Sequence, residues 1–243
     1  MFRFYDALTN WYLVEDETGL TLVDSAYPKS WPHLQRAIES IGRRVPDIRA
    51  IVLTHGHADH MGAAEHARVD VGARVYAHEA EEPRLRGEEP GGSSWALVPR
   101  LLPALWRPAA WVYLIHETLE GFMTPRWLKE VIPVADGEQI DAPGRPRLLF
   151  LPGHTRGHCG FELPERGVIF SGDELVTYDP LRGRGGPRLM PNELNDDPDL
   201  ARASLARLDG IDANVLLPGH GDPWFGDVAG AVQVARERVE TRW

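Results

Sequence analysis

Residues 54–60, with the sequence THGHADH, place three histidines and one aspartate within six positions. Because alternate residues of an extended segment point the same way, His55, His57 and Asp59 can share one face. His60 follows directly and can turn back toward the same place. Three imidazoles and a carboxylate exceed the ligand needs of one tetrahedral ion, so this segment predicts a metal site.

Three more metal-capable side chains follow apolar, strand-like segments further along the chain. His154 comes after LLFLPG, Asp173 after VIFSG and His220 after VLLPG. Strands of one sheet system can direct their ends to a common edge, and loops on a rigid scaffold commonly carry function. Together with residues 54–60 they make seven candidate ligands, a number that suits two ions sharing a bridge.

The composition agrees with this ligand chemistry. The chain of 243 residues has ten histidines and one cysteine, so imidazole and carboxylate groups are the expected metal ligands. The 26 basic and 36 acidic side chains give a formal net charge of −10, which disfavours binding to a nucleic acid. Residues 95–115 are apolar but contain two arginines and three prolines, which does not fit a membrane span.

The N-terminal residues lack the pattern of a secretory signal. We therefore expect a cytoplasmic protein that acts on a small molecule and binds neither nucleic acid nor a membrane.

The elements that must position the candidate ligands follow an alternation of strands and helices. Strands are expected at 10–14, 20–24, 49–53, 73–77, 147–151, 161–163, 168–170 and 214–217. Helices are expected at 30–41, 60–69, 198–208 and 228–239. This mixed pattern predicts an α/β domain built in layers.

Residues 82–130 differ from the rest, because they are rich in aromatic side chains and in helix-like patterns. We interpret them as a helical insertion near the active-site edge of a single domain spanning 1–243. An apolar pocket for an acyl group could be lined by Trp106, Trp111, Tyr113 or Phe122, and the two tryptophans are the candidate substrate-binding residues; packing is the alternative. An exposed aromatic insertion also leaves a homodimer open.

Residues 178–191 are rich in glycine, proline and arginine and are expected to form a loop. Tyr178 and Arg182 in this segment are further candidate substrate-binding residues. The segment is either a solvated loop or a lid in which an arginine binds an anionic group.

At these positions the chain resembles the metallo-β-lactamase fold superfamily. The signature His-x-His-x-Asp-His corresponds to residues 55–60, and LVDSAYP around Asp24 is similar to the N-terminal part of the family. The resemblance implies a four-layer αββα sandwich with the site at one edge. It implies two divalent metal ions, with zinc the usual occupant and iron or manganese in some members. The implied ligands are His55, His57 and His154 on one ion, Asp59, His60 and His220 on the other, and Asp173 as the bridge.

The resemblance and the ligand set together predict a binuclear metallohydrolase of the glyoxalase II-like or lactonase-like branch. A hydroxide between two ions is a nucleophile near neutral pH, since coordination lowers the pKa of water toward about 7. Asp59 would be a ligand and also the catalytic residue that orients this nucleophile. The expected substrate is an ester, thioester, lactone or amide of a small molecule. Lactonases place a tyrosine three positions after the bridging aspartate, where this chain has Val176.

Two other interpretations stay open. Persulfide dioxygenases are oxidoreductases of the same fold with one iron, for which His55, His154 and Asp173 would serve. In that case Arg182 or Arg184 could hold a glutathione carboxylate. The second alternative is a metal-binding protein without catalysis.

Overall fold

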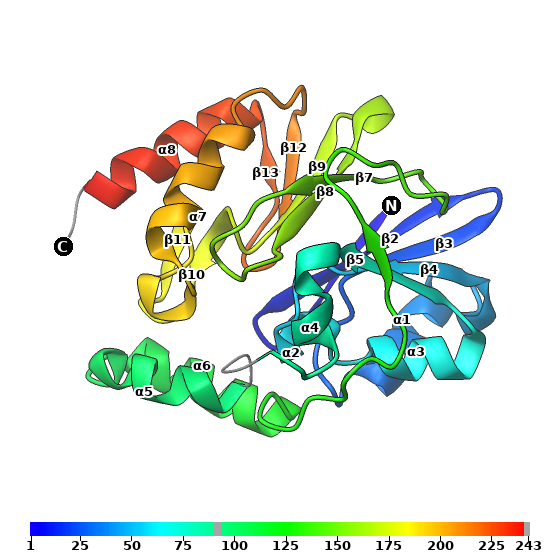
Figure 1. The fold of residues 1–243 in the computed structure, drawn as a ribbon, viewed down its shortest axis with the longest axis horizontal. Coiled ribbons are helices and arrows are strands. Elements are labelled where there is room, and N and C mark those ends of the chain that lie inside the picture. The colour runs from blue at the N-terminus through cyan, green and yellow to red at the C-terminus, as the bar shows by residue number, and fades with distance from the viewer. Residues whose placement is uncertain (90–93, 241–243) are drawn as a thin grey trace.

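The computed structural model describes residues 1–89 and 94–240, in which two β-sheets pack face to face between helices (Figure 1). The first sheet has six strands in the order β1-β2-β3-β4-β5-β6. Its strands are β1 (Phe2–Asp6), β2 (Thr9–Asp16), β3 (Gly19–Val23), β4 (Ile48–Val52), β5 (Arg74–His78) and β6 (Ile132–Val134).

The second sheet has five strands in the order β13-β12-β9-β8-β7. They are β7 (Arg147–Phe150), β8 (Cys159–Leu163), β9 (Val168–Gly172), β12 (Val215–Pro218) and β13 (Trp224–Phe225). A separate antiparallel hairpin pairs β10 (Val176–Asp179) with β11 (Arg184–Arg188).

The helices lie outside the two sheets, with α1 and α3 over the first and α7 and α8 over the second (Figure 1). Their bounds are α1 (Trp31–Ser40), α2 (Ala58–Met61), α3 (Ala64–Val71), α4 (Glu82–Leu85), α5 (Val98–Leu101), α6 (Pro108–Glu120), α7 (Pro198–Ser204) and α8 (Val228–Glu240). Short 3-10 turns span Val45–Asp47, Glu79–Glu81, Ser94–Leu97, Leu102–Ala104, Pro164–Arg166, Asn192–Leu194 and Leu205–Arg207.

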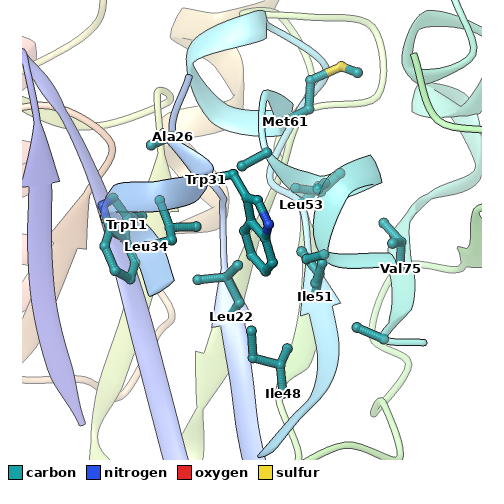
Figure 2. Packing of buried hydrophobic residues seen from close by; sticks show 14 of the residues in the cluster. Trp11, Leu22, Ala26, Trp31, Leu34, Ile48, Ile51, Leu53, Met61 and Val75 are labelled. Carbon is teal, nitrogen blue, oxygen red and sulfur yellow. The ribbon is translucent and has the colours of Figure 1, made fainter. Parts of the chain in front are cut away.

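The first sheet is apolar on both faces, because alternate residues of its strands enter two different cores. Leu22 of β3 packs toward α1, in the cluster that includes Trp31 and Leu34 (Figure 2). Its neighbour Val23 enters the core between the sheets. There the rings of Tyr12 and Phe170 lie 5.2 Å apart. These two cores, with a third between the second sheet and α8, confirm the predicted αββα sandwich.

The strands and helices predicted from the sequence are found within a few residues of their expected bounds, with one helix divided. The helix expected at 60–69 is two helices, α2 and α3. Gly62 lies between them, and its N–H donates to Ala26 O at 2.8 Å. A Cβ on Gly62 would lie 2.2 Å from the backbone of Tyr27. The N–H of Gly62 is thus bonded outside the helix, at the point where α2 ends and the chain turns before α3.

The prediction of a loop over residues 178–191 is wrong, because the hairpin of β10 and β11 occupies most of this segment. Gly183 at its turn has a φ of 63°, which glycine adopts without steric cost. Asp179 Oδ1 accepts hydrogen bonds from the N–H groups of Leu181 and Arg182. The Asp179 side chain thus stabilises the turn between the two strands. The content of glycine and proline alone does not indicate such a hairpin.

The segment 82–130 connects β5 to β6 and contains α4, α5 and α6. The inner face of α6 buries Ala110, Tyr113 and Glu117, whereas Trp111 and Ile115 are exposed on its outer face. None of the helices in the described ranges is long and apolar enough to cross a membrane. That residues 1–243 form one domain with this segment as an insertion stays a prediction.

Candidate metal centre

The seven candidate ligands lie together at the ends of strands from both sheets. Strands β9 and β12 are parallel neighbours, which brings Asp173 and His220 side by side. All seven side chains are buried, and the most exposed of them, His57, is only 8 % exposed. Such burial of polar groups requires partners.

The first ligand group consists of His55, His57 and His154, whose candidate donor atoms all lie within 4.8 Å of one another. His57 Nδ1 is 3.1 Å from His55 Nε2 and 3.0 Å from His154 Nε2. Metal–nitrogen bonds of about 2.0–2.1 Å at tetrahedral angles separate two nitrogens by about 3.3 Å. The spacing of these imidazoles therefore fits one divalent ion.

The second ligand group consists of Asp59, His60 and His220. Asp59 Oδ2 is 3.4 Å from His60 Nε2 and 3.5 Å from His220 Nε2. This carboxylate and the two imidazoles also offer ligand atoms suited to a first-row divalent metal.

Asp173 lies between the two groups. Its Oδ2 is 3.4 Å from His154 Nε2 and 3.2 Å from His220 Nε2, and its Oδ1 is 3.5 Å from His60 Nε2. One carboxylate therefore contacts ligands of both groups, as a bridging ligand must.

Two buried atoms of this cluster have no hydrogen-bond partner among the described residues, namely His60 Nε2 and Asp173 Oδ1. Leaving a buried polar atom unpaired costs about 1–3 kcal/mol. Because the two atoms face each other across the centre, a metal ion would satisfy both. The residues present therefore fit the divalent ions that the ligand pattern predicts.

Four of the five histidines among the candidate ligands are oriented in the same way. Nδ1 of each lies against an oxygen acceptor, which directs Nε2 into the centre. The acceptors are Thr54 Oγ1 for His55 at 3.0 Å, Asp24 Oδ2 for His60 at 2.8 Å, Asn195 Oδ1 for His154 at 2.9 Å and Leu8 O for His220 at 2.7 Å.

His57 has the reverse orientation. Its Nδ1 faces the other imidazoles, and its Nε2 is 3.1 Å from a guanidinium nitrogen of Arg84. Arg84 is itself buried and is held by Glu89 at 2.5 Å and by Asp196. The sequence gives no signal for this contact, because Arg84 lies 27 residues from its partner.

Glu81 ties the loop after β4 to the loop after β7. Its buried carboxylate accepts hydrogen bonds from Gly56 N at 2.7 Å, Gly157 N at 2.7 Å and Thr155 Oγ1 at 2.9 Å. Two ligand-bearing loops are thereby held at a fixed separation, by a residue that sequence patterns do not single out.

The two ligand groups differ in charge. Burial, with the neighbouring histidines, holds the pKa of His55 and His57 well below the usual range, so both are neutral. Burial also opposes the charged form of His60, but the nearby carboxylates, that of Asp173 first, outweigh it and raise its pKa well above the usual value. A metal ion entering the second group must therefore displace a proton.

Two contacts position Asp173: a hydrogen bond between its backbone N–H and His158, and the close approach of Gly219 to its carboxylate. His158 Nδ1 contacts Leu151 O at 3.0 Å, and its Nε2 accepts from Asp173 N at 3.0 Å. Burial lowers the pKa of His158 to about 3, which keeps this ring neutral. A Cβ on Gly219 would lie 2.1 Å from Asp173 Oδ1. The glycine that precedes His220 therefore leaves room for the carboxylate.

The candidate substrate-binding residues Trp106, Trp111 and Tyr178 lie at the surface of the protein. Trp106 is 76 % exposed, and Trp111 is 52 % exposed with its Nε1 bonded to Leu105 O. Tyr178 lines a surface pocket beside Trp224. Their role in substrate binding stays a prediction.

Arg182 donates hydrogen bonds to the carboxylates of Asp179 and Glu193. An anionic substrate group would therefore have to compete with two internal partners. Its role also stays a prediction.

Phe122 and Tyr113, which the sequence also offers as pocket residues, interact with the candidate ligands. The rings of Phe122 and His57 are 6.4 Å apart. Burial, followed by the nearby acidic groups, raises the pKa of Tyr113 well above its usual value, and Asp59 and Asp173 are among these groups. Their role in substrate binding stays a prediction as well.

Comparison with known proteins agrees with the geometry. The sequence model described as the metallo-beta-lactamase superfamily matches residues 5–220. The probable metallo-hydrolase YflN of Bacillus subtilis is 26% identical over 234 residues, which cover 90% of this chain and 83% of YflN. The hydroxyacylglutathione hydrolase GloC of Haemophilus influenzae is 26% identical over 196 residues, covering 75% of this chain and 78% of GloC.

Among solved structures, the metallo-beta-lactamase family protein TTHA1429 of Thermus thermophilus superposes with a TM-score of 0.71 at 27% identity. The superposition covers 96% of this chain and 75% of that one. With the sequence match across residues 5–220 and the ligand arrangement described above, the chain belongs to the metallo-β-lactamase superfamily.

Proposed function

We propose that this protein is a binuclear metal-dependent hydrolase that cleaves an ester, thioester, lactone or amide of a small molecule. The observation that carries the proposal is the position of Asp173, whose two oxygens lie 3.2 to 3.5 Å from imidazoles of both ligand groups, that of His154 in the first group and those of His60 and His220 in the second. His55, His57 and His154 would hold one ion, and Asp59, His60 and His220 the other. Asp173 would bridge the two.

Two divalent ions, when bound, make water a nucleophile near neutral pH and polarise a substrate carbonyl. The protein orients the groups around them. Thr9 Oγ1 contacts Asp59 Oδ2 at 3.0 Å and fixes this carboxylate, which we propose as the catalytic group that orients the attacking water. The neutral imidazoles of the first group supply lone pairs without prior loss of a proton.

Zinc is the first candidate for both ions, and iron and manganese are the alternatives. Imidazole and carboxylate ligands accept several first-row metals. The single cysteine, Cys159, points its sulfur toward the carbonyl oxygens of Leu53 and Thr54, at 3.6 and 3.5 Å. It therefore does not bias the centre toward zinc.

The proposed substrate class is supported by the similarity to YflN and GloC, of which GloC is a hydroxyacylglutathione hydrolase. We propose that the substrate is a small molecule, that the protein acts in the cytoplasm, and that it binds neither nucleic acid nor a membrane.

We also propose a homodimer through the exposed face of α6, where Trp111, Ile115 and Leu119 are more than half exposed. A molar mass in solution equal to that of one chain, measured by light scattering, would contradict the proposed dimer.

The hydrolase proposal is tested by elemental analysis of the purified protein together with turnover on a panel of esters, thioesters, lactones and amides. His57→Ala and Asp173→Ala should lose bound metal and activity together. His33→Ala is the control, because that ring is 42% exposed and contacts only the Asp6 carboxylate among ionic groups. Turnover retained without metal would overturn the mechanism. A single iron with oxygen consumption on glutathione persulfide, and no hydrolysis, would instead assign a dioxygenase.

A further inference from the structure

A chain of side-chain oxygens links the inserted helix α6 to a ligand of the second group. Glu117 Oε1 on α6 is 2.7 Å from Tyr27 Oη. Tyr27 Oη is 3.1 Å from Thr9 Oγ1, which is 3.0 Å from Asp59 Oδ2. All four side chains are buried, so water does not compete for these contacts.

The hydrogens available to this chain determine its direction. Thr9 has one hydroxyl hydrogen but contacts both Tyr27 and Asp59. A carboxylate that binds a metal ion is ionised, so Asp59 as a ligand can only accept. Thr9 therefore donates to Asp59 and accepts from Tyr27.

The same count of available hydrogens also determines the protonation of Glu117. The hydroxyl hydrogen of Tyr27 is used in the bond to Thr9, so the short contact between Tyr27 and Glu117 needs a hydrogen from the carboxyl group. A protonated carboxyl supplies one O–H donor. With Asp59 as an ionised ligand, only this arrangement turns all three contacts into hydrogen bonds.

We propose that Glu117 is a protonated positioning residue, whose O–H begins a one-way series of hydrogen bonds through Tyr27 and Thr9 that ends on Asp59. The inserted helix would thereby fix the orientation of a second-group ligand without touching the metal. This inference rests on the proposed function, because it assumes that Asp59 binds an ion.

The surroundings of Glu117 favour the neutral form. Its other oxygen, Oε2, is buried and has no hydrogen-bond partner among the described residues, and an ionised oxygen in that position would cost far more than a neutral one. Burial, followed by the charge of Asp59 and more weakly that of Asp173, raises the pKa of Glu117 well above its usual value. The charge of His60 acts in the opposite direction, as would a Tyr27 hydroxyl that donated to Glu117.

Three variants separate the links of this chain. Tyr27→Phe keeps the ring and removes the hydroxyl. Glu117→Met keeps the approximate volume and removes the donor, whereas Glu117→Gln retains an N–H donor toward Tyr27. Tyr5→Phe is the matched control, because Tyr5 is 67% exposed.

The metal-free proteins are titrated with Zn²⁺ in competition with a chelating dye, so that two binding steps are resolved. Loss of an outer hydrogen-bond partner typically weakens metal binding about 10–100-fold. We therefore expect the second step to weaken about tenfold or more in Tyr27→Phe and Glu117→Met, with the first step unchanged. Glu117→Gln and Tyr5→Phe should match the original protein. A second step of unchanged affinity in both Tyr27→Phe and Glu117→Met would overturn the positioning role.

Infrared spectroscopy of the metal-free protein tests the hydrogen directly. The difference spectrum between the original protein and Glu117→Gln should contain the carbonyl band of a protonated carboxyl group. A carboxylate band in its place would overturn the inference even if the metal affinities change. Failure of the original protein to bind a second ion would contradict the proposed function instead, and the infrared band would still decide the state of Glu117.

Discussion

The Asp24 carboxylate and the His60 imidazole, both buried, form a hydrogen bond of 2.8 Å between Oδ2 and Nδ1. Asp24 directly follows β3 in a left-handed conformation, with a φ of 55°. It also accepts from the backbone N–H and the hydroxyl of Thr54, each at 2.8 Å. One carboxylate thus joins the ends of β3 and β4 and directs His60 Nε2 into the centre.

Asp24→Asn should weaken binding of the second metal ion about 10- to 100-fold, because the ring of His60 loses a charged partner that fixes its orientation. Binding of the first ion should change much less. Titration of the metal-free protein with Zn²⁺ measures both steps. Asp209→Asn is the matched control, since Asp209 pairs with Arg236 on the surface. Equal affinities in Asp24→Asn and the control would show that Asp24 does not orient the ring.

The candidate ligands could be predicted from the sequence because their signal is local. Each lies within a few residues of an apolar strand, and four of them share one short segment. Strand order then brings the ends together, so motif and topology indicate the same place.

Apart from Thr54, which is adjacent to His55, the groups that orient these ligands could not be predicted, because their contacts join distant parts of the chain. Glu81 reaches Gly157 across 76 residues, and Tyr27 reaches Glu117 across 90. On α6 the inward residues Tyr113 and Glu117 and the outward residues Trp111 and Ile115 have the same four-residue spacing. Only tertiary packing decides which stripe faces the centre.

Gly219→Ala should lose most bound metal, because the added methyl group would lie 2.1 Å from Asp173 Oδ1 and 2.8 Å from His60 Cε1. Either the carboxylate or the loop must move, and both displace ligands. Elemental analysis after dialysis measures the loss. Gly230→Ala is the control, because its added methyl would meet no atom within 4 Å and would favour the helix α8. Full metal content in Gly219→Ala would show that the loop yields without disturbing Asp173.

Glu117→Gln should make the metal-free protein more stable, by an amount that grows as the pH rises above about 4.5. The pKa of Glu117 is raised in the folded state, so the stability associated with its neutral form is complete below the unfolded pKa and declines at higher pH. The slope approaches about 1.4 kcal/mol per pH unit for one proton. Glutamine has no such proton to lose.

Urea unfolding of both metal-free proteins at several pH values between about 4 and 8 measures this difference. Glu79→Gln is the control, because its carboxyl belongs to an exposed turn residue. A gap between Glu117→Gln and the original protein that stays constant across this range would show that Glu117 ionises normally in the folded state.

His158→Gln should reduce the sensitivity of the metal-free protein to acid. The folded pKa of His158 is about 3, against 6.5 for an unperturbed histidine, with burial as the main cause. As the pH falls from 6.5 toward 3, the unfolded chain takes up a proton that the folded protein excludes. Stability is therefore lost with decreasing pH, at up to about 1.4 kcal/mol per pH unit.

Glutamine can still accept from Asp173 N and donate to Leu151 O, but it binds no proton in this range. His158→Gln should therefore lose less stability than the original protein between about pH 6.5 and pH 4, as measured by urea unfolding. His33→Gln, at a half-exposed ring on α1, should follow the original protein. If the His158→Gln curve also follows the original protein, His158 takes up its proton at the same pH in both states. Such a ring could not serve as the permanently neutral acceptor for the backbone of Asp173.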